Sequence, residues 1–470
     1  MVAEKIQKKL SDSRNARWGA LLIVSFTMMM GYFFTDVVSP LSTILKQSAE
    51  QGGMGWSSTE YGFFAGSYSF INIFLLMLFL GGLILDRMGV RFTGIMATAF
   101  MFIGAVIKYY AIGFISPEGT VSLDFTLFGL IPSPAKTQVL VASLGFAIFG
   151  MGCEITGITV SKIITKWFTG HELALAMGVQ VGLARLGTAA ALSVSPMIAL
   201  QFHKLSTPIL FGAVLLLISF LSFFVYIVMD KKLDASISQE AGAMNESEDE
   251  KFKFSDLGVI FKNPGFWLIA FLCLLFYSGV FPFLKFASDL MVNKYGVSAK
   301  WAGWIPSILP YGTIILTPVF GTIYDRIGKG ASLMILGSLL LTACHICFAL
   351  PVFNTVWFAV IIMVLLGIAF SLVPSAMWPS VPKIIPMKQL GSAYAIIFYI
   401  QNIGLSMVPI LIGKVLDANT KIVNGQKMMD FTQAMWIFAG FGFVAVVLAT
   451  MLRFLDSRKH YGLEQANFNK

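Results

Sequence analysis

Long apolar segments alternate with short polar ones over almost the whole chain. An apolar run of about 20 residues is long enough to cross a bilayer as a helix, whereas a transmembrane barrel shows short segments of alternating polarity. Twelve such runs are predicted, at residues 18–45, 59–85, 92–114, 138–167, 172–200, 208–229, 264–292, 302–324, 332–350, 355–385, 390–416 and 431–455. The pattern predicts an all-α polytopic membrane protein with 12 transmembrane helices.

One polar segment, residues 230–263, interrupts this pattern and contains an acidic run at 245–251. Such a composition is typical of a solvated linker. We therefore expect a cytoplasmic N-terminus (1–17), an N-terminal six-helix bundle (18–229), a cytoplasmic linker (230–263), a C-terminal six-helix bundle (264–455) and a cytoplasmic tail (456–470). The N-terminus leads into a span too long for a signal-peptide core, so we expect no cleavage.

Composition agrees with a membrane protein, because only 12% of the residues are charged and 57% are hydrophobic. The net charge of +9 could suggest a nucleic-acid partner. However, most of the Lys and Arg residues fall on one side of the predicted membrane, which is the positive-inside pattern. The basic charge therefore orients the chain with both termini in the cytoplasm, and no nucleic acid is expected. Three basic residues lie inside spans and away from the span ends: Lys108, Arg185 and Lys285.

The two halves carry a repeated motif. After the second span stand Gly82, Asp86, Arg87, Gly89 and Arg91, and 239 residues later Gly321, Asp325, Arg326 and Gly328 repeat part of the spacing. A second register, at an offset of 217, aligns Gly150, Lys166 and Gly187 with Gly367, Lys383 and Gly404. In that register Glu154 meets Ser371 and Arg185 meets Asn402, so the N-terminal half has ions where the C-terminal half has neutral polar groups.

The motif, its repeat and the six-plus-six arrangement resemble the major facilitator superfamily over the whole chain. The resemblance implies two halves related by an axis along the membrane normal, with a substrate site between them at mid-depth. It implies a transporter and not an enzyme, with no cofactor and no metal, bound to a small-molecule substrate within the lipid bilayer. We expect a monomer.

A narrower resemblance is to the lysosomal dipeptide uniporter branch. It rests on Trp167-Phe168-x-Gly170-x-Glu172-Leu173-Ala174-Leu175-Ala176, on Ala184-Arg185-Leu186-Gly187, on Tyr32-Phe33-x-x-Asp36, on Glu154 and on Val280-Phe281-Pro282-Phe283. It implies uniport of dipeptides. Animal relatives carry an acidic dileucine signal near the N-terminus and work with a single-span partner. Residues 1–13 lack that signal, which favours a bacterial cytoplasmic membrane over the lysosomal membrane, and the sequence does not indicate an accessory subunit.

Glu154 and Arg185 are the central candidates, because each is an ion near the middle of an apolar span. A charge at that depth costs about 2.5–3.5 kcal/mol on insertion scales and is normally kept for function. Arg185 can hold a substrate carboxylate with two hydrogen bonds. Glu154 can bind a substrate ammonium group or carry a proton. The alternative is a buried ion pair that only fixes the helix register.

Five further residues complete the predicted substrate site. Asp36, in the outer half of the first span, and Lys285, in the outer third of the seventh, can contact substrate or pair when the outer mouth closes. Lys285 could instead extend to the outer interface. Gln401 and Asn402 suit peptide amides, or hydrogen bonds between helices. Trp378 lies in a proline-rich segment, where it either lines the cavity or fills a kink.

Asp86, Arg87, Arg91, Asp325 and Arg326 are predicted in cytoplasmic loops. With the motif glycines Gly82 and Gly89 they are predicted to form a conformational latch that holds the inner face in one state. Lys162 and Lys166 are predicted to be positive-inside anchors. The sequence contains no Walker motif or catalytic triad, and Cys344-His345-Ile346-Cys347 lacks a second ligand pair in sequence, which argues against a primary pump or a membrane enzyme.

The sequence therefore favours a secondary transporter of dipeptides that works by alternating access. Three other transport functions stay open: an organic-anion or sugar-phosphate exchanger, a proton-coupled symporter, and an effluxer of hydrophobic compounds. A non-transporting sensor or scaffold with a transporter fold is the alternative from a different class.

Overall fold

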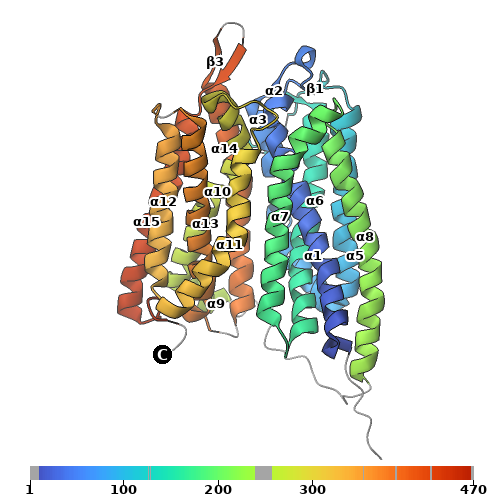
Figure 1. The fold of residues 1–470 in the computed structure, drawn as a ribbon, viewed down its shortest axis with the longest axis vertical. Coiled ribbons are helices and arrows are strands. Elements are labelled where there is room, and N and C mark those ends of the chain that lie inside the picture. Colours follow the sequence, from blue (N-terminus) through green and yellow to red (C-terminus); the bar gives the residue numbers. More distant parts are fainter. Residues whose placement is uncertain are drawn as a thin grey trace, which may run out of the picture.

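The computed structural model describes residues 10–124, 126–127, 129–238, 257–352, 354–386, 389–423 and 426–466. The acidic run at 245–251 and the first nine residues of the predicted cytoplasmic N-terminus lie outside the described residues. The described part is almost entirely helical, and Figure 1 shows two helical bundles side by side, with α7 of one bundle facing α11 of the other.

The first bundle begins with the 3-10 turn η1 (Leu10–Asp12). It continues through α1 (Arg14–Asp36), η2 (Ser39–Leu41), α2 (Ser42–Lys46), η3 (Ala49–Gln51), α3 (Ser58–Ser67), α4 (Phe70–Phe74), α5 (Met77–Phe114), α6 (Thr137–Phe168), α7 (Leu173–Gln201) and α8 (Thr207–Ser238). Strands β1 (Thr120–Val121) and β2 (Ala135–Lys136) form a short antiparallel pair in the loop before α6.

The second bundle contains α9 (Leu257–Phe261), α10 (Pro264–Tyr295), α11 (Trp304–Ile327), α12 (Gly330–Ala349), α13 (Val356–Ile384), α14 (Leu390–Ala418) and α15 (Thr432–Lys459). Strands β3 (Thr420–Val423) and β4 (Gln426–Met429) form an antiparallel hairpin between α14 and α15. The hairpin lies at the end of the molecule opposite the end of α15 (Figure 1). By the positive-inside rule this is the outer end.

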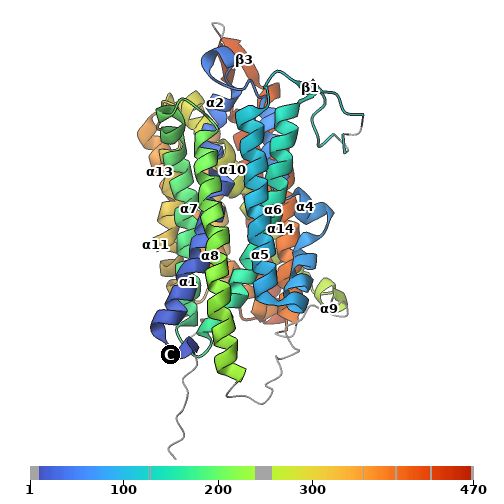
Figure 2. The same cartoon turned by 90° about the vertical axis from the view of Figure 1, so that its right-hand side faces the viewer.

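Eleven segments of the described chain are long and apolar enough to cross a membrane. The predicted second span is not a continuous helix, which corrects the expectation for residues 59–85. It consists of α3, α4 and the first part of α5, and α4 lies beside α6 and α14 (Figure 2). The break follows Ser67, whose Oγ bonds the Phe64 carbonyl, a local contact that competes with regular helix.

Helix α5 contains a reversal of the chain at Gly89, where φ is 74° and ψ is 172°. Asp86, before the glycine, pairs with Lys162, and Arg91, after it, pairs with Asp230. Both pairs lie at the inner ends of their helices, so the segment before Gly89 runs toward the cytoplasmic side and the segment after it runs back toward the outer side. With the broken second span counted, the chain therefore crosses the membrane 12 times, as predicted.

The outer ends of the two bundles are packed against each other through glycine. A Cβ on Gly62 or Gly66 of α3 would lie 2.3 Å from the carbonyl oxygen of Pro409 or Ser406 in α14. The spacing of these two glycines is the small-residue pattern that lets membrane helices approach closely. Hydrogen bonds and ion pairs between the bundles also lie toward these outer ends, so the molecule is closed on its outer side.

Candidate functional site

A cavity of about 230 Å³ lies between the two bundles. The seven residues predicted to contact substrate all line it: Asp36, Glu154, Arg185, Lys285, Trp378, Gln401 and Asn402. Aromatic residues without a role predicted from the sequence complete the wall: Tyr32, Tyr68, Tyr277, Phe281 and Phe398. The spans that hold these residues come from both halves, so the cavity exists only where the halves meet.

Glu154 is positioned by α6 and by the break in the second span. The Tyr68 hydroxyl donates a hydrogen bond of 2.9 Å to Glu154 Oε1. Tyr68 comes close to α6 because Gly150, one turn before Glu154, has no side chain. A Cβ there would lie 2.0 Å from the Tyr68 carbonyl oxygen. The tyrosine therefore fixes one carboxylate oxygen at the cavity wall.

Arg185, on α7, is held by aromatic rings. Its guanidinium carbon lies 5.1 Å from the ring centre of Phe370, 5.3 Å from that of Phe281 and 5.9 Å from that of Tyr32. These distances are typical of cation–π contacts. Among the described residues no carboxylate forms an ion pair with Arg185, so in this arrangement it and Glu154 face one cavity without pairing.

Asp36 and Lys285 close the outer side of the cavity. Lys285 Nζ lies 2.7 Å from Asp36 Oδ1 and donates a second bond of 2.9 Å to the Thr35 carbonyl. The two side chains are 9% and 13% exposed, so the pair is largely removed from water. Lys285 therefore bonds α1 of the other half and does not extend to the outer interface.

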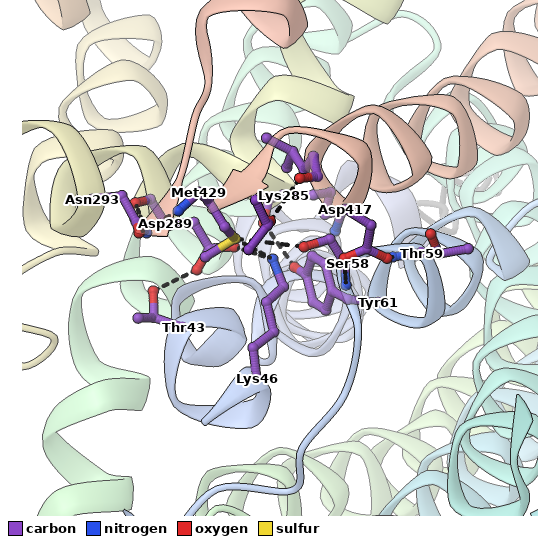
Figure 3. A network of polar contacts seen from close by, with 12 residues as sticks. Thr43, Lys46, Ser58, Thr59, Tyr61, Lys285, Asp289, Asn293, Asp417 and Met429 are labelled. Atoms are coloured by element: carbon purple, nitrogen blue, oxygen red, sulfur yellow. Dashed lines mark hydrogen bonds and ion pairs between the residues drawn. The ribbon is translucent and has the colours of Figure 1, made fainter. Parts of the chain in front are cut away.

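A second charge pair lies further out. Here the lysine comes from the N-terminal half and the aspartate from the C-terminal half, the reverse of Asp36 and Lys285. Lys46 Nζ lies 2.6 Å from Asp289 Oδ2, and the Thr43 hydroxyl donates to the other oxygen of Asp289 (Figure 3). Asp417 accepts from the backbone N–H groups of Ser58 and Thr59, at 2.8 and 2.7 Å. These bonds join the two halves. They could not be predicted from the sequence, because the residues stand near the ends of apolar runs.

Gln401 and Asn402 both lie on α14, where the sequence register predicted polar counterparts of Arg185. Asn402 Oδ1 accepts a bond of 2.6 Å from Ser69 Oγ, and its Nδ2 donates to the Phe398 carbonyl. Gln401 Oε1 accepts from Cys273 Sγ at 3.6 Å. The amides thus line the cavity, and they form hydrogen bonds between helices, which is the second of the two roles left open by the sequence.

Trp378 on α13 lines the cavity, as the first of its two predicted roles requires. Its Nε1 donates a bond of 2.9 Å to the Tyr277 hydroxyl, and its ring stacks on Phe398 with 4.9 Å between centres. Both contacts hold the indole against the cavity from the C-terminal half.

The predicted latch residues lie in helices and not in loops, which corrects the sequence expectation. Gly82, Asp86, Arg87 and Arg91 belong to α5 around the reversal at Gly89, and Asp325 and Arg326 form the last turn of α11. The ion pairs of Asp86 and Arg91 join elements of the same half: Asp86 contacts Lys162 of α6 at 3.1 Å, and Arg91 contacts Asp230. The side chains of Arg87 and Arg326 are exposed.

Helix α8 runs to Ser238, beyond the predicted span end at residue 229. Its extension carries Asp230 and Asp234, which pair with Arg91 and with Lys166. The Lys166 distances are 2.8 and 2.7 Å. Lys162 and Lys166 are therefore partners in ion pairs that tie α6 to α5 and α8.

Comparison with known proteins places this geometry in a family. The model of the Major Facilitator Superfamily matches residues 21–409 and 286–468. A curated relative, the lysosomal dipeptide transporter MFSD1 of Homo sapiens, is 28% identical over 408 residues, which cover 85% of this chain and 79% of the relative. The relative from Gallus gallus is 30% identical over 285 residues, covering 58% of this chain and 62% of the relative.

Solved structures share the fold at low identity. The nucleoside transporter NupG superposes with a TM-score of 0.67 at 16% identity, covering 93% of this chain and 99% of that one. A bacterial homolog of the human lysosomal transporter Spinster, in an inward-facing and occupied conformation, gives 0.65 at 13% identity, covering 95% and 98%. The chain belongs to the major facilitator superfamily and is a multi-pass membrane transporter, not an enzyme.

Proposed function

We propose that this transporter moves dipeptides by uniport, with Glu154 binding the amino end and Arg185 the carboxyl end. The observation that carries the proposal is the unpaired arrangement of these two ions at one cavity. A charge at mid-depth in the membrane without an ion partner is costly, and a zwitterion supplies an ion partner to both charges at once. The similarity to MFSD1, named as a dipeptide transporter, supports the same substrate class.

The middle of the peptide would meet the amides of Gln401 and Asn402. An amide side chain both donates and accepts, as a peptide bond does, so one site can accept peptides with different side chains. The aromatic wall formed by Tyr277, Phe281 and Trp378 offers an apolar surface to those side chains.

An organic-anion exchanger is less consistent with the cavity. A dianion needs two available cations, and the second basic group at this site, Lys285, already forms an ion pair with Asp36. Glu154 would also repel an anion. A proton-driven effluxer would have to function without Arg185, whose guanidinium lies among three aromatic rings of the cavity region.

Transport by alternating access would require the outer closure to open and the inner ends to approach each other. The bonds at Asp36, Lys285, Lys46, Asp289 and Asp417 would then break on the outer side. The latch residues around Gly89 would act on the inner side, where they brace one half as a rigid unit.

The direct test is a thermal-shift screen of the purified protein against amino acids, dipeptides, tripeptides, sugars and phosphates. Dipeptides are expected to raise the melting temperature most, because a ligand that binds only the folded state stabilises it by mass action. Flux in proteoliposomes should then follow the peptide gradient and ignore protonophores. Stabilisation by dianions alone would refute the proposed substrate, and uphill accumulation driven by a pH gradient would refute uniport.

A further inference from the structure

Lys108 of α5 is completely buried in the N-terminal half and takes no part in the proposed binding of peptide. Its exposed fraction is 0%. Within the described chain no carboxylate forms an ion pair with it. The charges of Lys285 and Asp36 act on it from further away and with opposite signs. A buried ammonium normally requires a partner, so the surroundings of Lys108 need an explanation.

The surroundings form a cage for a cation. Lys108 Nζ lies 4.2 Å from the ring centre of Phe146, 4.4 Å from that of Phe34 and 5.2 Å from that of Phe64. The three rings come from α6, α1 and α3, so three different elements contribute one face each. Aromatic cages of this kind are a known way to bind ammonium groups.

The polar side of the cage is the end of a broken helix. Helix α1 stops at Asp36, and Pro40, four residues later, has no N–H to donate to the Asp36 carbonyl. The last four carbonyls of a helix lack intrahelical donors. Two of these four carbonyls accept hydrogen bonds from lysines. Lys108 Nζ donates a bond of 3.3 Å to the Phe34 carbonyl, and Lys285 Nζ donates one of 2.9 Å to the Thr35 carbonyl.

In transporters with discontinuous helices, such freed carbonyls and helix C-termini coordinate the coupling cation. We propose that the cage of Phe34, Phe64 and Phe146 with the Phe34 carbonyl is a monovalent-cation site, permanently filled by the Lys108 ammonium. The tethered cation stabilises the break in α1 that positions Asp36 for its bond to Lys285. The outer closure therefore needs no free cation, and removing the lysine side chain opens the site to a small primary ammonium.

The first experiment measures cation binding by the purified Lys108→Ala variant, with propylammonium as the probe and 1-butanol as its neutral counterpart of similar size. Propylammonium is expected to raise the melting temperature by about 2 °C or more, saturably, while butanol does not. The matched control is Ile112→Ala, which removes a buried side chain of the same helix one turn further along. Wild type and Ile112→Ala should show no preference for the ammonium. Equal stabilisation of Lys108→Ala by both probes would mean an apolar cavity and would overturn the proposal.

The second experiment remains informative if Lys108→Ala does not fold. Lys108→Met keeps most of the volume but removes the charge, so the end of α1 loses its cation. A cysteine replaces Ser42, which is fully buried near the outer closure and has no hydrogen-bond partner for its Oγ in the described chain. Lys108→Met is expected to raise the rate at which an impermeant thiol reagent labels this cysteine from outside at least severalfold. An unchanged rate would refute the role in outer closure. Neither test uses a peptide, so each can fail independently of the proposed dipeptide transport.

Discussion

Ser69 Oγ lies 2.6 Å from Asn402 Oδ1 and joins the two halves of the transporter at the break in the second span. The preceding residue, Tyr68, donates to Glu154. Two adjacent residues of one irregular segment therefore contact the proposed amine-binding carboxylate and an amide of the opposite half. A shift of the Glu154 side chain on substrate binding can therefore be transmitted to the interface between the halves through the single peptide unit that joins Tyr68 to Ser69.

Ser69→Ala should therefore slow transport more than it weakens substrate binding. The variant loses one hydrogen bond between the halves, typically worth about 0.5–1.5 kcal/mol, but no proposed contact to peptide. The comparison is between dipeptide affinity by thermal shift and exchange rate in proteoliposomes. Ser67→Ala is the control, because within the described chain the Ser67 hydroxyl bonds only the Phe64 carbonyl of its own helix. Equal losses of rate in both variants would assign the effect to helix stability and not to contact between the halves.

The two ends of a dipeptide should depend on different residues. Acetylating the amino terminus is expected to weaken wild-type binding by about tenfold to a hundredfold, since hydrogen bonds to charged groups contribute about 1.5–3 kcal/mol. Acetylation should weaken binding to Glu154→Gln much less. Likewise, amidating the carboxyl terminus should weaken binding to wild type strongly and binding to Arg185→Ala much less. For each residue, the affinities of wild type and variant for the free and the modified peptide form one double-mutant cycle, with the stability of the empty protein measured alongside. If acetylation lowers the affinity of Glu154→Gln by the same factor as that of wild type, Glu154 does not hold the amine.

Breaking the charge pair of the outer closure should favour the open outer side. Asp36→Asn leaves Lys285 buried without its partner, and loss of one member of a buried pair commonly costs about 3–5 kcal/mol. Labelling of a cysteine at Ser42 by an impermeant reagent is expected to accelerate in Asp36→Asn. The double variant Asp36→Asn with Lys285→Met should lie closer to wild type. Glu172→Gln, which breaks the Arg17–Glu172 pair inside one half, is the control and should not alter labelling.

The latch should influence the conformational equilibrium without contacting substrate. Asp86→Asn removes the pair with Lys162 and is expected to lower the transport rate. Its dipeptide affinity should change less than that of Arg185→Ala, because Asp86 does not line the cavity. Glu118→Gln, on an exposed outer loop, serves as the control for loss of a carboxylate. A greater loss of affinity for Asp86→Asn than for Arg185→Ala would contradict this division of roles.

The sequence predicted the residues whose chemistry contrasts with their surroundings. Glu154, Arg185 and Lys285 stand out because an ion within an apolar run is rare, and all three line the cavity. Tyr68 could not be distinguished in the same way, since an aromatic residue in an apolar run is equally suited to lipid or to helix packing. Its role depends on the break beside it, which places the hydroxyl on Glu154.

Irregular backbone was the feature that the hydropathy pattern concealed. Residues 59–85 are mostly apolar, and hydropathy does not register the interruption after Ser67 or the left-handed Leu76, with φ of 51°. The Lys46–Asp289 pair was also hidden, because both residues stand near the ends of apolar runs, where charged residues are common. Only the packing of α2 against α10 brings them together.

Gly62 and Gly66 have a consequence for how the conformational equilibrium can be controlled. Where they contact α14, backbone meets backbone, so the outer closure has no side chain at these points that can rotate away to relieve a clash. One added methyl group would act as a steric wedge against the outer-closed state alone, because the proposed alternating access would separate α3 from α14 when the outer side opens. Alanine at either position is thus a small, uncharged and ligand-independent means of trapping the opposite conformation for structure determination.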